Sequence, residues 1–488
     1  MTVRHLLAPL AVAAALAACA PPAPPVAPAP APVEARLAEI FDDTTFAHAH
    51  WGVEIRSLTT GETLYSRNAG RMFMPASNVK LFTGAAALAT LGPEFRYRTE
   101  IFASGDVEPD GTLRGQLLVR ADGDPTTSGR FYDDPRDRFA GWADSLRAHG
   151  ISRIAGNVVA VDDGLDDQTI GAGWGMYPQS ATYAAEFSGM MFNESAVQVA
   201  LYPGEVGDTG VVRLHPATGY VDVLNRTRTV AAGESGSIRV IPRGPGAGIV
   251  VEGDVTADGG PQRQNVGLPD PTAYYVTALR ETLVERGIAI DGASLTAVDE
   301  AELGRARLLF AYRSPPMGEV VTAMMKPSQN QLAEVILKTV GREMRGRGSA
   351  SAGISVVDSL CAAWDLPTER LLMRDGSGLS RYNLVAPTLT TSLLDHLRRQ
   401  PIPGEWEESL PIAGVDGTLR NRLRETPAEG RVRAKTGTLG TVRALSGYLT
   451  TASGEEIVFS TMINGHLRTA ADVDRVVDEA LLLLIESR

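Results

Sequence analysis

Lysine is rare in this chain. Only four of its 46 basic residues are lysines, and the other 42 are arginines. An arginine guanidinium keeps its proton in proteins and cannot act as a base, whereas a lysine can do so once its pKa is lowered. Because lysine occurs at so few positions, these are the first places to look for chemistry: Lys80, Lys326, Lys338 and Lys435.

Cysteine is almost absent as well. The two cysteines are Cys19, in an N-terminal leader, and Cys361, so the mature fold has no obvious disulfide. This does not identify the compartment, because many exported proteins lack disulfides. The sequence has no Walker motif and no dinucleotide-binding glycine motif. The net charge of −12 and the pI near 5.2 argue against nucleic acid as a main partner.

The leader indicates export. Its apolar run, Leu6–Ala18, follows Arg4 and His5 and is too short to span a bilayer, but it fits the core of a signal peptide. The run ends in Leu-Ala-Ala-Cys19, which resembles a bacterial lipobox, where the cysteine is lipidated and becomes the new N-terminus. The alternative is an ordinary signal peptide with an incidental cysteine. We expect residues 1–19 to be a lipoprotein-type signal peptide, with lipidation at Cys19.

A short tether follows the leader. Residues 20–32 are all proline, alanine or valine and should form an extended polyproline-type segment. At about 3.1 Å per residue, this segment reaches some 40 Å. We therefore expect a periplasmic protein that is tethered to the outer membrane and touches it only through its lipidated N-terminus.

The chain is long enough for two or three domains, since its 488 residues exceed a single typical core. Two groups of segments frame it. The first group is a helix at 33–41, strands at 50–58 and 62–67, and an apolar helix that follows Pro75 and stops at Gly92-Pro93. The second group comprises helices at 317–325, 330–344, 350–364 and 388–399, strands at 443–451 and 456–463, and a helix at 469–486. Together they predict one discontinuous α/β domain of residues 33–93 and 304–488.

Residues 94–303 have a different character. Short β-type runs alternate there with Gly, Pro and Asp turns, and helical stretches interrupt them at 138–149 and 272–286. One of the β-type runs is expected at 112–120. We interpret this region as a β-rich insert of one or two subdomains, with two favoured.

The first motif that carries chemistry is Ser77-x-x-Lys80. Residues three apart share a helix face, so both side chains should point the same way from the first turn after Pro75. A serine hydroxyl needs a base to become a nucleophile, and a desolvated lysine can be that base. The helix start also offers free N–H groups for an oxyanion. Alone, the pattern is weak, since most Ser-x-x-Lys matches are accidental.

Two further motifs contain or adjoin two of the other three lysines, Lys435 and Lys326. Ser328-x-Asn330 follows Lys326 and falls between two predicted helices, where a hydroxyl can relay a proton and an amide can hold a carbonyl. Lys435-Thr436-Gly437-Thr438 lies just before the strand expected from about Val442. Lysine and threonine there can bind a carboxylate, and the glycine lets another backbone approach. The alternative for each is an ordinary solvated loop.

In this order the three motifs are the set found in β-lactamases and penicillin-binding proteins. The gap of 248 residues from Lys80 to Ser328 exceeds what a simple β-lactamase needs. It resembles the class C low-molecular-mass penicillin-binding proteins, the D-alanyl-D-alanine carboxypeptidase/endopeptidase family. Other stretches similar to that family are Leu91–Pro93, Gly123–Thr126, Ile154–Val158, Asp375–Arg381 and Gly414–Leu419. Gln329 and Thr438 depart mildly from the family's Ser-Asp-Asn and Lys-Thr-Gly-Ser, and a lipobox is less typical of it.

The resemblance implies a transpeptidase/β-lactamase-like fold, an antiparallel sheet flanked by helices, and a serine peptidase that acts on peptidoglycan stem peptides and cross-links. Ser77 would attack the D-Ala-D-Ala carbonyl, Lys80 would be the base, and Ser328 would pass the proton to the leaving group. The N–H groups of Ser77 and Thr438 would form the oxyanion hole. Residues implied in substrate binding are Asn330, Lys435, Thr436, Gly437, Thr438 and, by family analogy alone, Arg381.

The same resemblance implies that β-lactams acylate Ser77, and it implies no metal or cofactor. It leaves open whether Arg381 is only a structural surface residue, whether the protein forms a homo-oligomer, and how carboxypeptidase and endopeptidase activities are balanced.

Two rival functions are compatible with parts of this sequence. One is a β-lactamase or esterase on the same fold, although no Glu-x-x-x-Asn pattern lies between the motifs to place a deacylating water. The other is a non-catalytic cell-wall scaffold lipoprotein. A Ser-His-Asp hydrolase is disfavoured, because the seven histidines lie outside the motifs and no Gly-x-Ser-x-Gly elbow occurs. His48-x-His50 is interpreted as part of a strand rather than a metal site.

Overall fold

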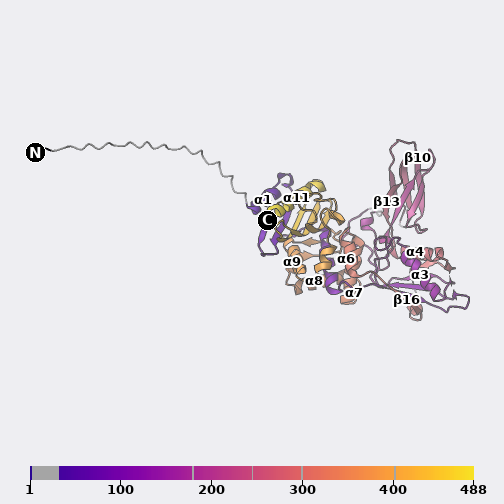
Figure 1. Cartoon of the computed structure of the whole chain (residues 1–488). Coiled ribbons are helices and arrows are strands. Elements are labelled where there is room, and N and C mark those ends of the chain that lie inside the picture. Colours follow the sequence, from indigo (N-terminus) through magenta and orange to yellow (C-terminus); the bar gives the residue numbers. More distant parts are fainter. Residues whose placement is uncertain (3–31, 178–180, 245, 298–299, 401–402, 488) are drawn as a thin grey trace.

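The computed structural model describes residues 1–2, 32–177, 181–244, 246–297, 300–400 and 403–487 (Figure 1). Cys19 and nearly all of the expected leader and tether lie outside these ranges, so the signal-peptide and lipidation predictions stay predictions. Within the described ranges, no helix has both the length and the apolar character needed to cross a bilayer.

An antiparallel five-stranded sheet forms the centre of the larger part of the molecule. Its strand order is β19 (Val432–Leu439), β20 (Val442–Thr450), β21 (Glu456–Asn464), β1 (His50–Ser57) and β2 (Thr63–Arg67). β1 pairs with β21 over its whole length, so the N-terminal hairpin is built onto the C-terminal strands. This confirms the α/β prediction.

The predicted strands missed β19. The sequence predicts the Lys-Thr-Gly motif just before the strand from about Val442, but the motif lies inside β19, which is an edge strand of the sheet. Val432 and Ala434 are buried on either side of the partly exposed Arg433, as in a strand with one face on the core. The polar residues from Lys435 to Thr438 interrupt this apolar/polar alternation in the sequence.

Helices cover both faces of the sheet. One face packs against α1 (Val33–Phe41) and α11 (Ala470–Ser487). The other carries α2 (Val79–Thr90), α6 (Met317–Met325), α7 (Asn330–Arg345), α8 (Ala350–Ala363), α9 (Pro387–Arg398) and the short α10 (Pro403–Ser409). A small hairpin, β17 (Leu371–Leu372) with β18 (Leu384–Val385), joins α8 to α9.

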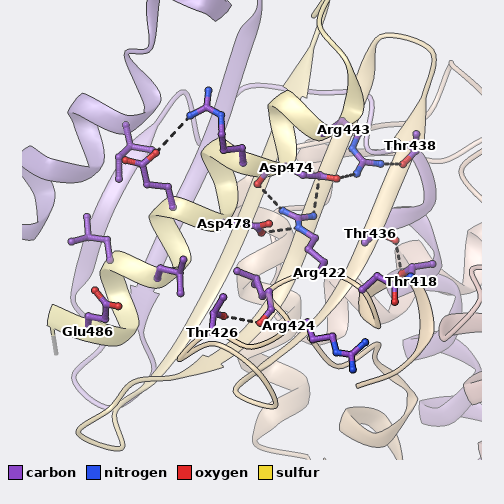
Figure 2. A pocket seen from close by; sticks show the side chains of 18 of the residues that line it. Thr418, Arg422, Arg424, Thr426, Thr436, Thr438, Arg443, Asp474, Asp478 and Glu486 are labelled. Atoms are coloured by element: carbon purple, nitrogen blue, oxygen red, sulfur yellow. Dashed lines mark hydrogen bonds and ion pairs between the residues drawn. The ribbon is translucent and has the colours of Figure 1, made fainter. Parts of the chain in front are cut away.

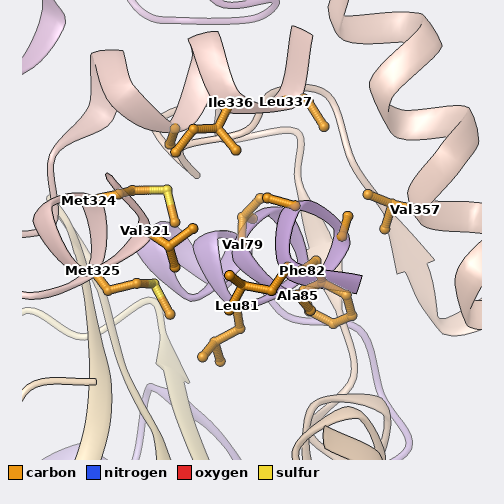
Figure 3. Close-up of a cluster of buried hydrophobic side chains, with 14 of the residues drawn as sticks. Val79, Leu81, Phe82, Ala85, Val321, Met324, Met325, Ile336, Leu337 and Val357 are labelled. Carbon is orange, nitrogen blue, oxygen red and sulfur yellow. The ribbon is translucent and has the colours of Figure 1, made fainter. Parts of the chain in front are cut away.

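Helix α2 is the most enclosed element, because every residue from Val79 to Leu88 is buried. Figure 3 shows its apolar side chains surrounded by those of α6, α7 and α8, among them Met324, Ile336 and Val357. Gly84 allows this close packing, since a Cβ there would lie 3.3 Å from the Met324 methyl. A helix packed on all sides holds the residues at its start in one position.

The insert begins after α2 and has two parts. In the first, a sheet of order β15-β7-β5-β3-β16 and a small sheet β14-β6-β4 pack with two helices. The strands are β3 (Arg98–Ala103), β4 (Thr112–Leu113), β5 (Leu117–Ala121), β6 (Arg153–Ile154), β7 (Val158–Val161), β14 (Ala289–Ile290), β15 (Ser294–Leu295) and β16 (Arg307–Arg313). The helices are α3 (Asp137–Ala148), α4 (Pro271–Glu285) and the short α5 (Glu300–Leu303).

The second part of the insert is all β. It has one sheet of β9 (Val211–His215), β8 (Ala196–Tyr202) and β13 (Gln262–Gly267), and another of β10 (Val223–Val230), β12 (Ile249–Thr256) and β11 (Ile238–Pro242). Figure 1 shows the β10 sheet projecting away from α3 and α4.

Two sequence-based boundaries differ from the structure. The single strand expected at 112–120 is two strands, since the chain turns at Gly115, whose backbone lies against Gly105. The predicted end of the insert, residue 303, precedes β16, although β16 pairs with β3 in the insert's sheet.

Candidate active site

Ser77 lies in a tight turn at the start of α2. A 3₁₀ turn, Ala76–Asn78, precedes the helix, which itself starts at Val79 rather than at the serine. Ala76 has a left-handed backbone with φ of 49°, a conformation that costs a non-glycine residue about 1 kcal/mol or more. The strain is located at the residue directly before the candidate nucleophile.

Two glycines let other backbones press against this turn. A Cβ on Gly437 of β19 would lie 2.5 Å from the Pro75 carbonyl oxygen. A Cβ on Gly378, where φ is 84°, would lie 1.9 Å from the Ala76 carbonyl oxygen. Gly437 therefore has a packing role, and the turn is clamped between the sheet edge and the loop that contains Gly378.

Lys80 is buried at the centre of the site. Its Nζ donates to Ser77 Oγ at 3.1 Å, to Asn330 Oδ1 at 2.6 Å and to the Ser377 carbonyl at 2.7 Å. Burial lowers the pKa of Lys80 to about 7, against the opposing effect of the Asp375 and Glu334 carboxylates. A substantial fraction of Lys80 is therefore neutral near pH 7, as a general base requires.

Asn330, the first residue of α7, is oriented from both sides. Its Oδ1 accepts from Lys80, and its Nδ2 donates to the Tyr183 carbonyl of the insert at 2.7 Å. The next residue, Gln331, donates to the Thr182 and Ala185 carbonyls at 2.8 and 3.0 Å. The insert thus sets which way the Asn330 amide faces.

Ser328 and Lys435 complete the group of side chains at the site. Ser328 lies between α6 and α7 with a left-handed φ of 64°. The buried Lys435 Nζ donates to Ser328 Oγ at 2.8 Å and to the Thr436 carbonyl at 2.9 Å. Burial, and then the charge of Lys80, lower the pKa of Lys435. The structure therefore brings together three motifs that are separated by hundreds of residues in the sequence.

Two buried carboxylates that the sequence analysis missed support Lys80. Glu334 accepts from the backbone N–H groups of Gly376, at 3.1 Å, and Ser377, at 2.9 Å. Burial and repulsion from Asp375 raise the pKa of Glu334 to about 7. By holding this backbone, Glu334 positions the Ser377 carbonyl that accepts from Lys80.

Asp375 organises the same loop. It accepts from the backbone N–H groups of Gly378 at 2.9 Å and Ser380 at 2.7 Å, and from Trp174 Nε1 of the insert at 2.9 Å. Spacing was an available clue for Glu334, which lies four residues after Asn330 and hence on the same helix face. No sequence feature indicated that Trp174 or Tyr183 would reach the site.

A cleft of about 560 Å³ opens over these residues. Thr436 and Thr438 lie in its wall, where Thr436 Oγ1 donates to Thr418 Oγ1 at 2.8 Å and Thr438 Oγ1 accepts from Arg443. Arg381 lines the cleft with an exposed side chain. The predicted residues that line the cleft are Ser77, Ser328, Asn330, Arg381, Thr436 and Thr438.

The other two lysines have structural contacts. Lys326 donates to the Leu410 carbonyl at 2.7 Å and to Asp416 at 2.6 Å. Lys338 pairs with Asp166 and donates to the Gln168 carbonyl at 2.6 Å. Of the four lysines, Lys80 and Lys435 therefore belong to the candidate active site, and Lys326 and Lys338 stabilise loops.

Histidine does not take the place of Lys80. His466 lines the cleft, but its Nδ1 contacts the Arg468 carbonyl at 3.0 Å. Among the residues that the structure describes, no cluster of three or more His, Cys, Asp or Glu is arranged to hold a metal ion. His50 is the first residue of β1, whereas His48 lies in the turn before it, so only one of the two histidines belongs to a strand.

With this geometry established, comparison with known proteins identifies the family. The family model described as "D-Ala-D-Ala carboxypeptidase 3 (S13) family" matches residues 33–484. This chain belongs to that S13 family. The prediction of a serine-type D-Ala-D-Ala carboxypeptidase family is thereby confirmed.

The relatives agree with this assignment. The chain is 35% identical over 439 residues to a D-alanyl-D-alanine carboxypeptidase of Actinomadura sp. (strain R39), covering 88% of this chain and 80% of the relative. It is 27% identical over 445 residues to the D-alanyl-D-alanine carboxypeptidase DacB of Haemophilus influenzae, covering 89% of each.

A solved structure shows the same fold. The crystal structure of penicillin binding protein 4 (dacB) from Haemophilus influenzae superimposes with a TM-score of 0.75 at 24% identity, covering 91% of this chain and 97% of that one. The expected fold, a transpeptidase/β-lactamase-like antiparallel sheet flanked by helices with a β-rich insert, is confirmed.

Proposed function

We propose that this S13 family member is a periplasmic serine D-Ala-D-Ala carboxypeptidase/endopeptidase that forms an acyl-enzyme at Ser77. The observation that carries the proposal is the contact of Lys80 Nζ with Ser77 Oγ at 3.1 Å, made by a buried lysine whose pKa is about 7. A serine next to an amine that is partly neutral at physiological pH has the base that it needs.

In the proposed acylation, Lys80 takes the Ser77 proton while Ser77 Oγ attacks the carbonyl of the D-Ala-D-Ala bond. The oxyanion that forms accepts from the N–H groups of Ser77 and Thr438. Ser77 lies at a helix start, where the first N–H groups have no intrahelical partner. Loss of one such donor typically costs about 10²–10³ in rate.

Ser328 delivers a proton to the leaving nitrogen as the C–N bond breaks, and the proton that Lys80 took from Ser77 replaces it on Ser328. Its Oγ accepts from Lys435 Nζ, which leaves its own hydrogen free for donation. A lysine amine donates whether or not it is charged, so the contact persists at either protonation state of Lys435. Water then hydrolyses the ester and regenerates Ser77.

Substrate binding is assigned to the cleft wall. The hydroxyl of Thr436, next to the buried Lys435, is placed to bind the carboxylate of the leaving residue, and the Asn330 amide to bind a substrate carbonyl. Arg381, exposed at the cleft, is assigned to the side chain of the stem peptide. The substrates are peptidoglycan stem peptides and cross-links.

β-Lactams are expected to acylate Ser77. The related penicillin binding protein 4 from Haemophilus influenzae has been crystallised in complex with a β-lactam, and that structure covers 92% of this chain with a TM-score of 0.72. For localisation, the apolar run before Cys19 supports export and lipidation, with the proline-rich segment as a tether to the outer membrane.

Ser77→Ala tests the proposal, with Ser453→Ala in an exposed turn as the matched control. Fluorescent penicillin should label the wild type and Ser453→Ala but not Ser77→Ala, while circular dichroism shows that all three are folded. Mass spectrometry of digested peptidoglycan should show loss of pentapeptides and cross-links only with the labelled proteins.

Other outcomes select the rivals. Rapid turnover of a chromogenic cephalosporin would favour a β-lactamase or esterase. A folded wild type that neither binds penicillin nor changes peptidoglycan would favour a non-catalytic scaffold lipoprotein.

A further inference from the structure

A second hollow adjoins the active-site cleft. It is a groove of about 1260 Å³ on the face of the sheet that carries α11. Thr418, Thr436, Thr438 and Arg443 line both the groove and the cleft. Figure 2 shows the groove running from these threonines beneath α11 towards Glu486. The two hollows therefore meet at the edge strand β19.

The groove begins where the leaving group departs. Lys435 contacts both Ser328, which is assigned to the leaving nitrogen, and the carbonyl of Thr436, whose hydroxyl is assigned to the carboxylate of the leaving residue. Thr436 in turn donates to Thr418, beyond which the groove opens. A departing free D-alanine has few atoms, whereas the groove has more than twice the volume of the cleft, about 1260 against 560 Å³.

The groove wall is preorganised and polar. Arg422 pairs with Asp474 at 3.1 Å and with Asp478 at 2.7 Å, and Arg443 pairs with Asp474 (Figure 2). Interlinked ion pairs of this kind hold their side chains in place with much of their charge neutralised. The wall therefore offers hydrogen-bonding atoms without a strong field of one sign.

Arg424, which also lines the groove, lies outside this network. Its side chain is 64% exposed and its guanidinium lies 3.8 Å from the Glu425 carboxylate, a long contact in solvent. Solvent-exposed pairs of this length contribute little, so the Arg424 charge stays available to a ligand. The lining as a whole suits a peptide with both carboxylates and amines.

We propose that this groove binds the amine-side peptide of a cross-link while the enzyme acts as an endopeptidase. This peptide carries its own carboxylates, and its nitrogen is the leaving group. The amide C–N bond breaks, the carbonyl carbon stays on Ser77 Oγ, and the nitrogen takes a proton through Ser328. The inference rests on the proposed function and adds a binding site for the larger of its two leaving groups.

Narrowing the groove tests the inference. Ala471, exposed at the start of α11, lines the groove, and Ala471→Trp would fill part of it. Ala362→Trp, at an exposed alanine of α8 that lines neither hollow, is the matched control. The substrates are a purified cross-linked muropeptide dimer and an N-acylated tripeptide ending in D-Ala-D-Ala, and fluorescent penicillin reports acylation.

We expect Ala471→Trp to lower kcat/KM for the dimer by about tenfold or more, the loss of a modest binding contribution, while tripeptide hydrolysis and penicillin labelling stay within about twofold. Ala362→Trp should leave all three unchanged. Arg424→Glu should lower dimer cleavage by about threefold to tenfold, and Arg424→Lys should restore most of it.

Each other outcome is decisive. Equal losses on the dimer and tripeptide in Ala471→Trp would overturn the inference, because the groove would then act through the catalytic residues. Unchanged dimer cleavage would overturn it as well. A wild type that hydrolyses the tripeptide but not the dimer refutes the groove assignment and leaves the carboxypeptidase intact, whereas loss of every activity and of labelling would refute the proposed function itself.

Discussion

The contact between Lys80 and Asn330 allows a direct test of how the site controls its base. Asn330→Asp changes one NH₂ group into an oxygen with almost no change in volume. In the wild type, Lys80 Nζ lies 2.6 Å from the neutral amide oxygen of Asn330. The substitution places a negative charge at this position. An opposite charge within hydrogen-bonding distance favours the protonated amine, so the pKa of Lys80 should rise.

The size of the effect follows from the starting pKa of about 7. An adjacent opposite charge shifts a pKa by about one to three units, which would move Lys80 to about 8–10. At pH 7 the neutral fraction of Lys80 would fall from about one half to between roughly 9% and 0.1%. Acylation at pH 7 should therefore slow by about 5-fold to 500-fold and recover as the pH rises.

The assay is the second-order acylation rate with a chromogenic cephalosporin, measured from pH 5 to 10 by stopped flow. Wild type should show an acid limb near pH 7, and Asn330→Asp one at least a unit higher. Asn330→Ala is the control, because it removes the hydrogen bonds to Lys80 and to the Tyr183 carbonyl without adding a charge. It should lower the acylation rate without moving the acid limb to higher pH. An Asn330→Asp profile that is lower but not displaced would refute the role of Lys80 as the base.

Three further predictions concern the support of the site. Trp174→Phe keeps an aromatic ring but removes the 2.9 Å hydrogen bond to Asp375, which is worth about 1.5–3 kcal/mol to a charged acceptor, so acylation should fall about tenfold. An unchanged rate would mean that the insert does not position the loop. Gly437→Ala forces a Cβ against the Pro75 carbonyl and should cost about 1–3 kcal/mol by thermal melting and more than tenfold in acylation, with unaltered melting counting against the clamp. Lys80→Met should remove part of the pH dependence of stability. The pKa of buried Lys80 is below its unfolded value, so the free energy of unfolding of the wild type should rise between pH 7 and 10 by about 3 kcal/mol more than that of the variant. An equal change in the free energy of unfolding for both proteins would contradict this.

Helices and strands could be predicted from the sequence where the hydrophobic periodicity is strong. The apolar helix after Ser77, the closing helix and most strands of the central sheet were found from spacing, because burial imposes a period of 3.6 or 2 on these segments. β19 was missed, since the residues from Lys435 to Thr438 serve the cleft and break that alternation. Functional positions disagree with local patterns where chemistry determines the residue type.

Residue types alone indicated the chemistry. Arginine cannot be a base, so a chain with four lysines directs attention to Ser77-x-x-Lys80, and a helix places that pair on one face. The order of the three motifs was enough to predict the family. The motifs singled out Lys80 and Lys435, but the sequence could not show the burial that lowers the pKa of each, because that depends on what lies around each ammonium.

The tertiary structure decided the environment. Burial of Lys80 among α2, α7 and the Ser377 loop lowers its pKa, and no local pattern encodes this desolvation. The contacts of Tyr183 with Asn330 and of Trp174 with Asp375 join residues 147 and 201 positions apart. The sequence by itself determined which groups can react, since that is a property of side chains; the fold decided which of them meet, in which protonation state and beside which groove, since distance and solvent exclusion arise only from packing.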